Sequence, residues 1–99
     1  MDLNLKGKIA LVVASSKGLG KAIASNLAAE GCNVMLTSRN AEQLEVTKNE
    51  LLSTAKGRVE CFPCDITKTD EIHALVVATR KQLGNINILI NNAGGPPGG

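Results

Sequence analysis

The sequence predicts an α/β fold in which one parallel sheet lies between two layers of helices. Four apolar segments alternate with three segments of helical periodicity, in the order βαβαβαβ, and the connections are short enough for right-handed crossovers. The first apolar segment also runs into a turn with two glycines and then into the first helix. Such a turn presents backbone N–H groups and a positive helix end to a phosphate.

The first predicted strand, over 8–14, is an unbroken apolar run. A run of this kind is typical of a strand that is buried on both faces, as in a parallel sheet. The first helix is predicted over 18–30. Its alanines would let it lie close on the sheet, and Gly31 is a natural carboxyl-terminal stop.

A second buried strand is predicted over 33–38 and a second helix over 41–56. Asn40 is expected to cap this helix, because Gln43 stands three residues further on at the capping-box position. Gly57 is expected to end it.

The segment 58–63 alternates polar and apolar residues and contains Pro63, which is typical of a strand at the edge of a sheet. Thr67 is expected to cap a third helix over 68–83. The last predicted strand, over 86–91, is again apolar. If the strand before the glycine turn lies at the switch point, the strand order is 3-2-1-4, and the fold is a Rossmann-type three-layer α/β/α arrangement.

Composition excludes several classes of function. The chain has 99 residues, a net charge of +2 and a single aromatic residue, so it offers no stacking platform and no basic surface for nucleic acid. We expect no membrane partner, because no segment reaches the roughly 20 apolar residues of a membrane span and no signal peptide is evident. A cytoplasmic protein is the expectation.

The cysteines Cys61 and Cys64 have the spacing of a redox or half-zinc motif. In a strand, residues three apart point to opposite faces, about 10 Å apart along the chain, which is beyond disulfide reach. A zinc site needs two more ligands, and only Cys32 and His73 remain. Structural thiols, an exposed helical histidine and no metal are therefore expected.

Polar or glycine-rich turns follow all four predicted strands, where ligands bind in open α/β sheets. We expect these turns to form a dinucleotide site. The predicted cofactor-binding residues are Ala14, Ser15, Ser16, Lys17, Gly18, Leu19 and Gly20 in the first turn, Ser38, Arg39 and Asn40 in the second, Asp65 and Ile66 in the third, and Asn92, Ala93 and Gly94 in the fourth.

These turns resemble those of the short-chain dehydrogenase/reductase family, and in particular its bacterial 3-oxoacyl acyl-carrier-protein reductases. The family's T-G-x-x-x-G-x-G turn maps onto residues 13–20, and its N-N-A-G motif is present unchanged at 91–94. The resemblance covers 6–94. It implies that Asp65 contacts the adenine amino group, that the Ile66 backbone flanks the ring and that Asn92 lies beside the ribose.

The sequence departs from the family at two positions, because Val13 and Ala14 replace the family's Thr and first Gly. Alanine can serve in the turn only with a negative φ, so we expect the turn to persist with altered phosphate contacts.

Charge predicts NADP(H) rather than NAD(H) as the cofactor. An NAD enzyme of this fold places an acidic residue after the second strand to accept from the ribose 2′-hydroxyl, whereas this chain has Arg39. A guanidinium can pair with a 2′-phosphate, and Lys17 is a second cation at the corresponding position of NADP-preferring relatives. The alternative is that Arg39 and Lys17 are solvated surface charges, and that Asp65 and the N-N-A-G segment only form turns.

No catalytic residue is expected in this chain. The family uses a Ser, a Tyr and a Lys from beyond the fourth strand, and this sequence contains no tyrosine. We therefore interpret 1–99 as the amino-terminal half of an NAD(P)-binding domain, truncated after the fourth strand. Its parent would reduce a small-molecule ketone or 3-oxoacyl substrate, and the chain alone would be inactive.

The alternative is a natural, non-catalytic half-domain that binds nucleotides or serves in assembly. A methyltransferase of the same fold class is disfavoured by the N-N-A-G motif. The resemblance implies a homo-oligomeric parent, a tetramer or a dimer. The chain itself is expected to self-associate through the free edge of the strand over 86–91.

Overall fold

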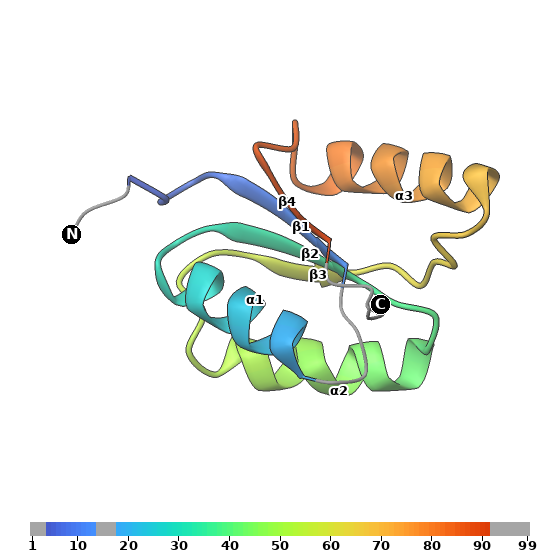
Figure 1. The fold of residues 1–99 in the computed structure, drawn as a ribbon. Helices are drawn as coiled ribbons and strands as arrows, with labels where there is room; N and C mark the ends of the chain where they lie inside the picture. Colours follow the sequence, from blue (N-terminus) through green and yellow to red (C-terminus); the bar gives the residue numbers. More distant parts are fainter. Residues whose placement is uncertain (1–3, 14–17, 92–99) are drawn as a thin grey trace.

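Four parallel strands form a single sheet in the order β3-β2-β1-β4 (Figure 1), which confirms the predicted topology. The structure is a computed structural model and describes residues 4–13 and 18–91. Its elements are β1 Ile9–Val13, α1 Leu19–Ala29, β2 Asn33–Thr37, α2 Ala41–Leu52, β3 Val59–Cys61, α3 Thr69–Gln82 and β4 Ile88–Asn91. No helix in the described part of the chain is long and apolar enough to span a bilayer.

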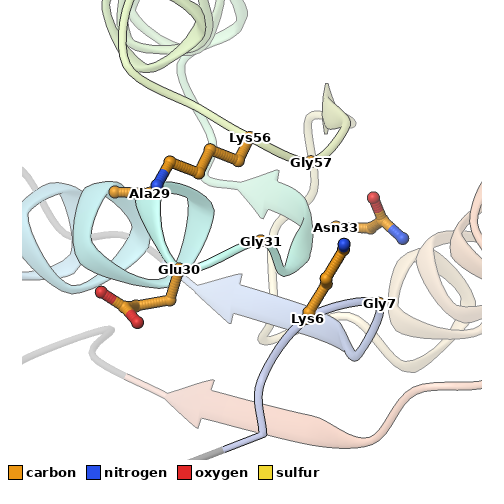
Figure 2. Close-up of a pocket in the computed structure, with 8 residues that line it drawn as sticks. All are labelled: Lys6, Gly7, Ala29, Glu30, Gly31, Asn33, Lys56 and Gly57. Carbon is orange, nitrogen blue, oxygen red and sulfur yellow. The ribbon is translucent and has the colours of Figure 1, made fainter. Parts of the chain in front are cut away.

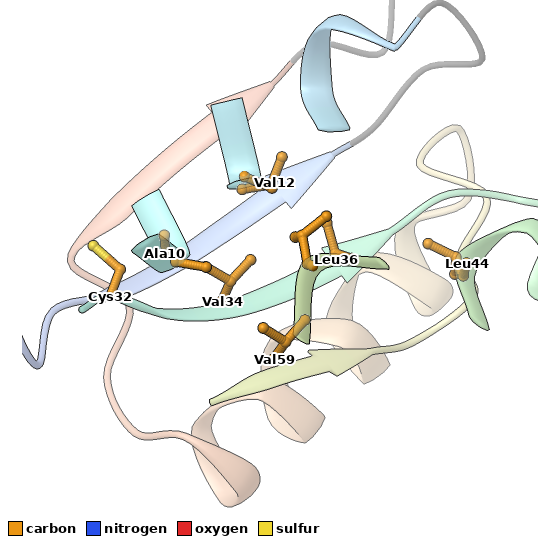
Figure 3. Close-up of a cluster of buried hydrophobic side chains, with 10 residues drawn as sticks. Ala10, Val12, Cys32, Val34, Leu36, Leu44 and Val59 are labelled. Atoms are coloured by element: carbon orange, nitrogen blue, oxygen red, sulfur yellow. The ribbon is translucent and has the colours of Figure 1, made fainter. Parts of the chain in front are cut away.

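Helices α1 and α2 cover one face of the sheet and α3 covers the other (Figure 1). The α1/α2 side buries alternate residues of the central strands, with Ala10 and Val12 from β1 beside Val34 and Leu36 from β2 (Figure 3). The intervening residues Leu11 and Met35 are buried on the α3 side. Because both faces are covered, the central strands are apolar without alternation.

Helix α1 packs its smallest residues toward the sheet. Gly20, Ala24 and Ala28 are its buried positions, and they recur every four residues along one side of the helix. The predicted stop is confirmed at Gly31, which has a φ of 97°. The N–H of the next residue, Cys32, donates to the carbonyl of Leu27 at 3.0 Å, as in a Schellman turn.

Two asparagine side chains extend strand pairing at the amino ends of the strands. Asn33 Oδ1 accepts the N–H of Arg58 at 2.8 Å, ahead of β3. Asn87 Oδ1 accepts the N–H of Ile9 at 2.9 Å, and the Asn87 N–H donates to the Ile9 carbonyl at 2.8 Å. These side chains satisfy backbone groups just where the regular ladder begins.

The predicted helix over 41–56 is too long, because α2 ends at Leu52. Ser53 turns its hydroxyl back onto the carbonyl of Glu50, at 2.8 Å. Lys56 then donates its N–H to the carbonyl of Ala28 at 2.9 Å instead of to a carbonyl of its own helix. The predicted start was right, since Asn40 Oδ1 accepts the N–H of Gln43 at 3.0 Å.

The predicted strand over 58–63 is shorter in the structure, where β3 spans only Val59–Cys61. Beyond Cys61 the contact with β2 continues in a less regular form, because the Phe62 N–H donates to the Leu36 carbonyl at 3.0 Å while the Phe62 carbonyl accepts the Thr37 hydroxyl at 2.6 Å. The strand predicted over 86–91 likewise begins later, at Ile88, because Asn87 pairs with β1 partly through its side chain.

The predicted cap of the third helix is wrong. The residue at the N-cap position of α3 is Lys68, whose side chain makes no capping hydrogen bond. Thr67 instead donates its hydroxyl to Asp65 Oδ1 at 2.7 Å. An aspartate two residues earlier was therefore the better partner for the threonine.

Candidate functional site

The carboxyl ends of the four strands lie at one edge of the sheet. Val13 is paired with Thr37 of β2 on one side and with Asn91 of β4 on the other, and Leu36 is paired with Cys61 of β3. The strand ends that precede the four predicted turns therefore lie side by side.

The turn before α1 is described only from Gly18 onward, so Ala14, Ser15, Ser16 and Lys17 lie outside the described residues. Gly18 is the N-cap of α1, with a left-handed φ of 83°. A Cβ added to it would meet no atom of the described residues within 4 Å, so the space at this position is open as far as the structure describes the chain. Glycine is needed here for its conformation rather than for close packing. Leu19 is 57% exposed, whereas Gly20 is one of the buried residues of α1.

The turns after β2 and β3 are tied together by two hydrogen bonds. The buried Thr37 donates its hydroxyl to the carbonyl of Phe62 at 2.6 Å, and the N–H of Cys64 donates to the carbonyl of Ser38 at 2.9 Å. The hydrogen bonds from Thr67 are the main cause that lowers the pKa of the Asp65 carboxyl, and the charge of the neighbouring Arg39 lowers it further.

Arg39 is exposed, and its guanidinium forms no ion pair with any residue that the structure describes. Its neighbours hold the turn in place: Ser38 Oγ accepts the N–H of Asn40 at 3.4 Å, and Asn40 caps α2. A cation is thus presented at the end of β2 by backbone that is fixed on both sides.

Asp65 is an ionised acceptor in a fixed orientation. Its Oδ1 accepts both the hydroxyl and the N–H of Thr67, at 2.7 and 3.0 Å, and its carbonyl accepts the N–H of Lys68 at 3.0 Å. The two Thr67 bonds are the main reason why the pKa of this carboxyl lies below its ordinary value. The second carboxylate oxygen, Oδ2, has no hydrogen-bond partner in the described part of the chain.

The N–H of Ile66, next in the chain, has no acceptor among residues 4–13 and 18–91. An ionised acceptor and a backbone donor thus stand on consecutive residues. The remaining predicted residues, Asn92, Ala93 and Gly94, lie outside the described residues.

The sequence interpretation missed Glu71, in the first turn of α3. Its Oε1 accepts the N–H of Asp65 at 2.8 Å. The only available signal was an acidic residue near a helix start, and such residues occur there for the helix dipole alone. A hydrogen bond between Glu71 and the backbone six positions earlier has no characteristic sequence pattern.

The cysteines are structural in the described parts of the chain. Cys64 is buried, and Cys61 donates its thiol to Glu45 Oε2 at 3.1 Å. Burial, and then the Glu45 carboxylate, raise the pKa of Cys61 to about 11. No group of three or more His, Cys, Asp and Glu among the described residues could hold a metal ion, and His73 is exposed on α3.

An open cavity of about 570 Å³ lies between the end of α1 and the segment around Lys56 (Figure 2). Lys6, Glu30 and Asn33 also line it. Because Asn33 begins β2, this cavity lies at the amino end of the sheet, away from the turns that carry Arg39 and Asp65. It holds none of the predicted site residues.

Comparisons with known proteins agree with this arrangement. The family model described as short chain dehydrogenase matches residues 8–99. A fatty acyl-CoA reductase of Acinetobacter baylyi (strain ATCC 33305 / BD413 / ADP1) is 38% identical over 91 residues, which are 92% of this chain and 30% of the relative. The chain thus spans about a third of the length of the curated relatives it matches.

Two solved structures show the same fold with a cofactor. The L-sorbose reductase of Gluconobacter frateurii, complexed with NADPH and L-sorbose, superposes with a TM-score of 0.90 at 33% identity, over 98% of this chain and 37% of that one. An actinorhodin polyketide ketoreductase variant with NADPH gives a TM-score of 0.84 at 34% identity, over 97% and 36% of the two chains.

Proposed function

The chain belongs to the short-chain dehydrogenase family, and on that premise we propose that it is the cofactor-binding half of an NADP(H)-dependent oxidoreductase. Bound NADPH would supply the hydride. The residues of this chain would hold the adenosine half of the cofactor and its phosphates.

The observation that carries the proposal is that Arg39 and Asp65 follow neighbouring strand ends. Arg39 is an exposed cation without an ion-pair partner in the described chain, at the position where an NAD-binding protein of this fold has an acidic residue. A 2′-phosphate would give it a charge-assisted, bidentate partner. Lys17, from the first turn, is proposed as a second cation for the same phosphate.

The adenine ring fits the chemistry of the third turn. Asp65 Oδ2, which has no partner among the described residues, can accept from the exocyclic amine, and the Ile66 N–H can donate to a ring nitrogen. The open space at Gly18 would admit the pyrophosphate at the start of α1. Ser15, Ser16, Leu19, Gly20, Ser38 and Asn40 are proposed to line this path, and Asn92, Ala93 and Gly94 to flank the ribose near the nicotinamide.

Reduction of a carbonyl needs a proton donor with a suitable pKa beside the carbonyl oxygen. The family's tyrosine is missing, because this sequence contains none. We therefore propose that the 99-residue chain binds the cofactor without turning over a substrate, and that the whole enzyme acts on a ketone or a 3-oxoacyl compound.

Calorimetric titration of the chain with NADP⁺ and with NAD⁺ tests the proposal. Tighter binding of NADP⁺ is expected. Equal affinities would contradict the argument from Arg39, and absence of binding to either would contradict the proposed function. NADPH oxidation by the purified chain with a small ketone would contradict the claim that it cannot catalyse.

A further inference from the structure

We propose that Glu71 is a positioning residue for adenine recognition, because it locks the Asp65 turn onto helix α3. The proposal rests on the proposed function and adds a residue to it. Glu71 would not contact the cofactor. It would act by fixing the backbone from which Asp65 and Ile66 contact the ring.

The turn that carries Asp65 is closed upon itself. The Lys68 N–H reaches the Asp65 carbonyl at 3.0 Å, and Thr67 donates twice to Asp65 Oδ1. These bonds set the internal shape of the turn. They join residues within three positions of one another, so they do not hold the amino end of the turn against the helix.

Glu71 supplies that missing connection. Its Oε1 accepts the part-buried N–H of Asp65 at 2.8 Å, across six residues. A carboxylate acceptor makes this bond stronger than one between neutral groups. Glu71 also stands in the first turn of α3, where the helix end stabilises its negative charge.

With this bond in place, each backbone polar group of Asp65 and one carboxylate oxygen are occupied. Oδ2 and the Ile66 N–H are left as the acceptor and the donor of the turn, in the part of the chain that the structure describes. Their spacing is set by the backbone that Glu71 holds. Recognition of two atoms on the edge of a purine requires both groups at once, so it is sensitive to this backbone.

The test compares NADP⁺ with deamino-NADP⁺, in which hypoxanthine replaces adenine. Hypoxanthine carries a carbonyl in place of the exocyclic amine and a proton on the adjacent ring nitrogen. In the same orientation it therefore cannot donate to Asp65 Oδ2 or accept from the Ile66 N–H. The phosphates of the two dinucleotides are the same. The quantity compared is the selectivity ratio, the dissociation constant of deamino-NADP⁺ divided by that of NADP⁺. This ratio isolates recognition of the base from every other contribution to binding.

Glu71→Ala should weaken NADP⁺ binding about tenfold and leave deamino-NADP⁺ binding almost unchanged. Glu71→Asp, whose shorter side chain cannot reach the Asp65 N–H, should behave in the same way. Glu71→Gln keeps an acceptor oxygen at the same length and should restore the wild-type ratio. Asp70→Ala is the matched control, since Asp70 is acidic, lies in the same helical turn and makes no side-chain hydrogen bond within the described residues.

Each outcome decides the proposal. A lower ratio in the Ala and Asp variants, with rescue by Gln and no change in the control, supports it. An unchanged ratio, with or without an equal loss of affinity for both ligands, overturns the positioning role and leaves the proposed function intact. A wild-type chain that binds neither ligand overturns both. Circular dichroism on every variant verifies that the fold is kept.

Discussion

Asn87 forms hydrogen bonds with both backbone polar groups of Ile9: its side-chain Oδ1 accepts the Ile9 N–H, and its own N–H donates to the Ile9 carbonyl. The two residues are 78 positions apart, and the two bonds measure 2.9 and 2.8 Å. They attach the amino end of β4 to β1 before the regular ladder starts at Ala10 and Ile88. This pair therefore helps to dock the last strand of the sheet.

Replacing Asn87 by Ala should lower the free energy of unfolding by about 1 kcal/mol, because the Ile9 N–H loses its acceptor near the surface. Urea unfolding followed by circular dichroism measures the effect. Asn85→Ala is the control, since Asn85 is exposed and has no hydrogen bond among the described residues. Equal effects of the two substitutions would show that the Asn87 side-chain bond contributes nothing.

Replacing Arg39 by Ala should weaken NADP⁺ binding about tenfold or more and leave NAD⁺ binding unchanged. The lost interaction is a charge-assisted bond to a phosphate that NAD⁺ does not carry. Titration calorimetry with both cofactors measures the selectivity. Arg80→Ala, which removes the same charge from the far end of α3, should leave both affinities unchanged. A parallel fall for both cofactors would contradict a contact with the 2′-phosphate.

Cys61 should react slowly with an alkylating reagent. At about pH 8 a smaller fraction of Cys61 is thiolate than of a free cysteine, although a more basic thiolate is a stronger nucleophile. The net rate should be about tenfold lower than that of a free cysteine. Glu45→Gln removes the nearby carboxylate and should accelerate the reaction, whereas Glu50→Gln on the same helix should not. Iodoacetamide labelling with peptide mapping measures the rate at this cysteine alone. Equal rates in the two variants would rule out control by Glu45.

The same thiol makes stability depend on pH in the alkaline range. The folded pKa of about 11 lies above the ordinary value of 9.0. The folded state therefore binds this proton more tightly than the unfolded state does. The stabilisation is complete below about pH 9 and is lost as the pH rises through about 11. Cys61→Ser should flatten the fall in unfolding free energy over that range.

Local patterns were enough to predict the architecture. The unbroken apolar run of β1 marks a strand covered on both faces, and Pro63 marks β3 as the edge of the sheet. The Asn40 cap was equally predictable, since its partner, Gln43, lies within the same turn of the chain.

Errors arose where a side chain or a backbone N–H had more than one possible partner. Thr67 could have capped α3, but the Asp65 carboxylate accepts its hydroxyl instead. Likewise, α2 stops early because Lys56 gives its N–H to Ala28 on another helix. Propensity within one segment cannot weigh such competing bonds, and the same holds for the Asn87 bond to Ile9.

The candidate site was predictable as a set of turns but not as a geometry. Strand order alone brings Arg39 and Asp65 to neighbouring turns. The orientation of Asp65 depends on Glu71, which was not predicted. The residues 14–17 and 92–94 of the candidate site lie outside the described chain and remain predictions.

The 99-residue chain is proposed to self-associate through β4, with a second copy as the partner. Within the described residues β1 is the one strand beside β4, so along Ile88, Leu89 and Ile90 the other edge carries backbone donors and acceptors on an apolar strand. Leu89 is 62% exposed on this strand, on the α3 side of the sheet. Two such edges are self-complementary about a two-fold axis, which a homodimer requires.

Leu89→Lys should therefore make the chain more monomeric, because it would place two like charges near that axis and remove apolar contact. Sedimentation velocity over a range of concentrations measures the association. Leu52→Lys is the matched control, since Leu52 is 46% exposed on α2, away from β4. A wild-type chain that stays monomeric at high concentration would contradict the proposal, as would equal effects of the two substitutions.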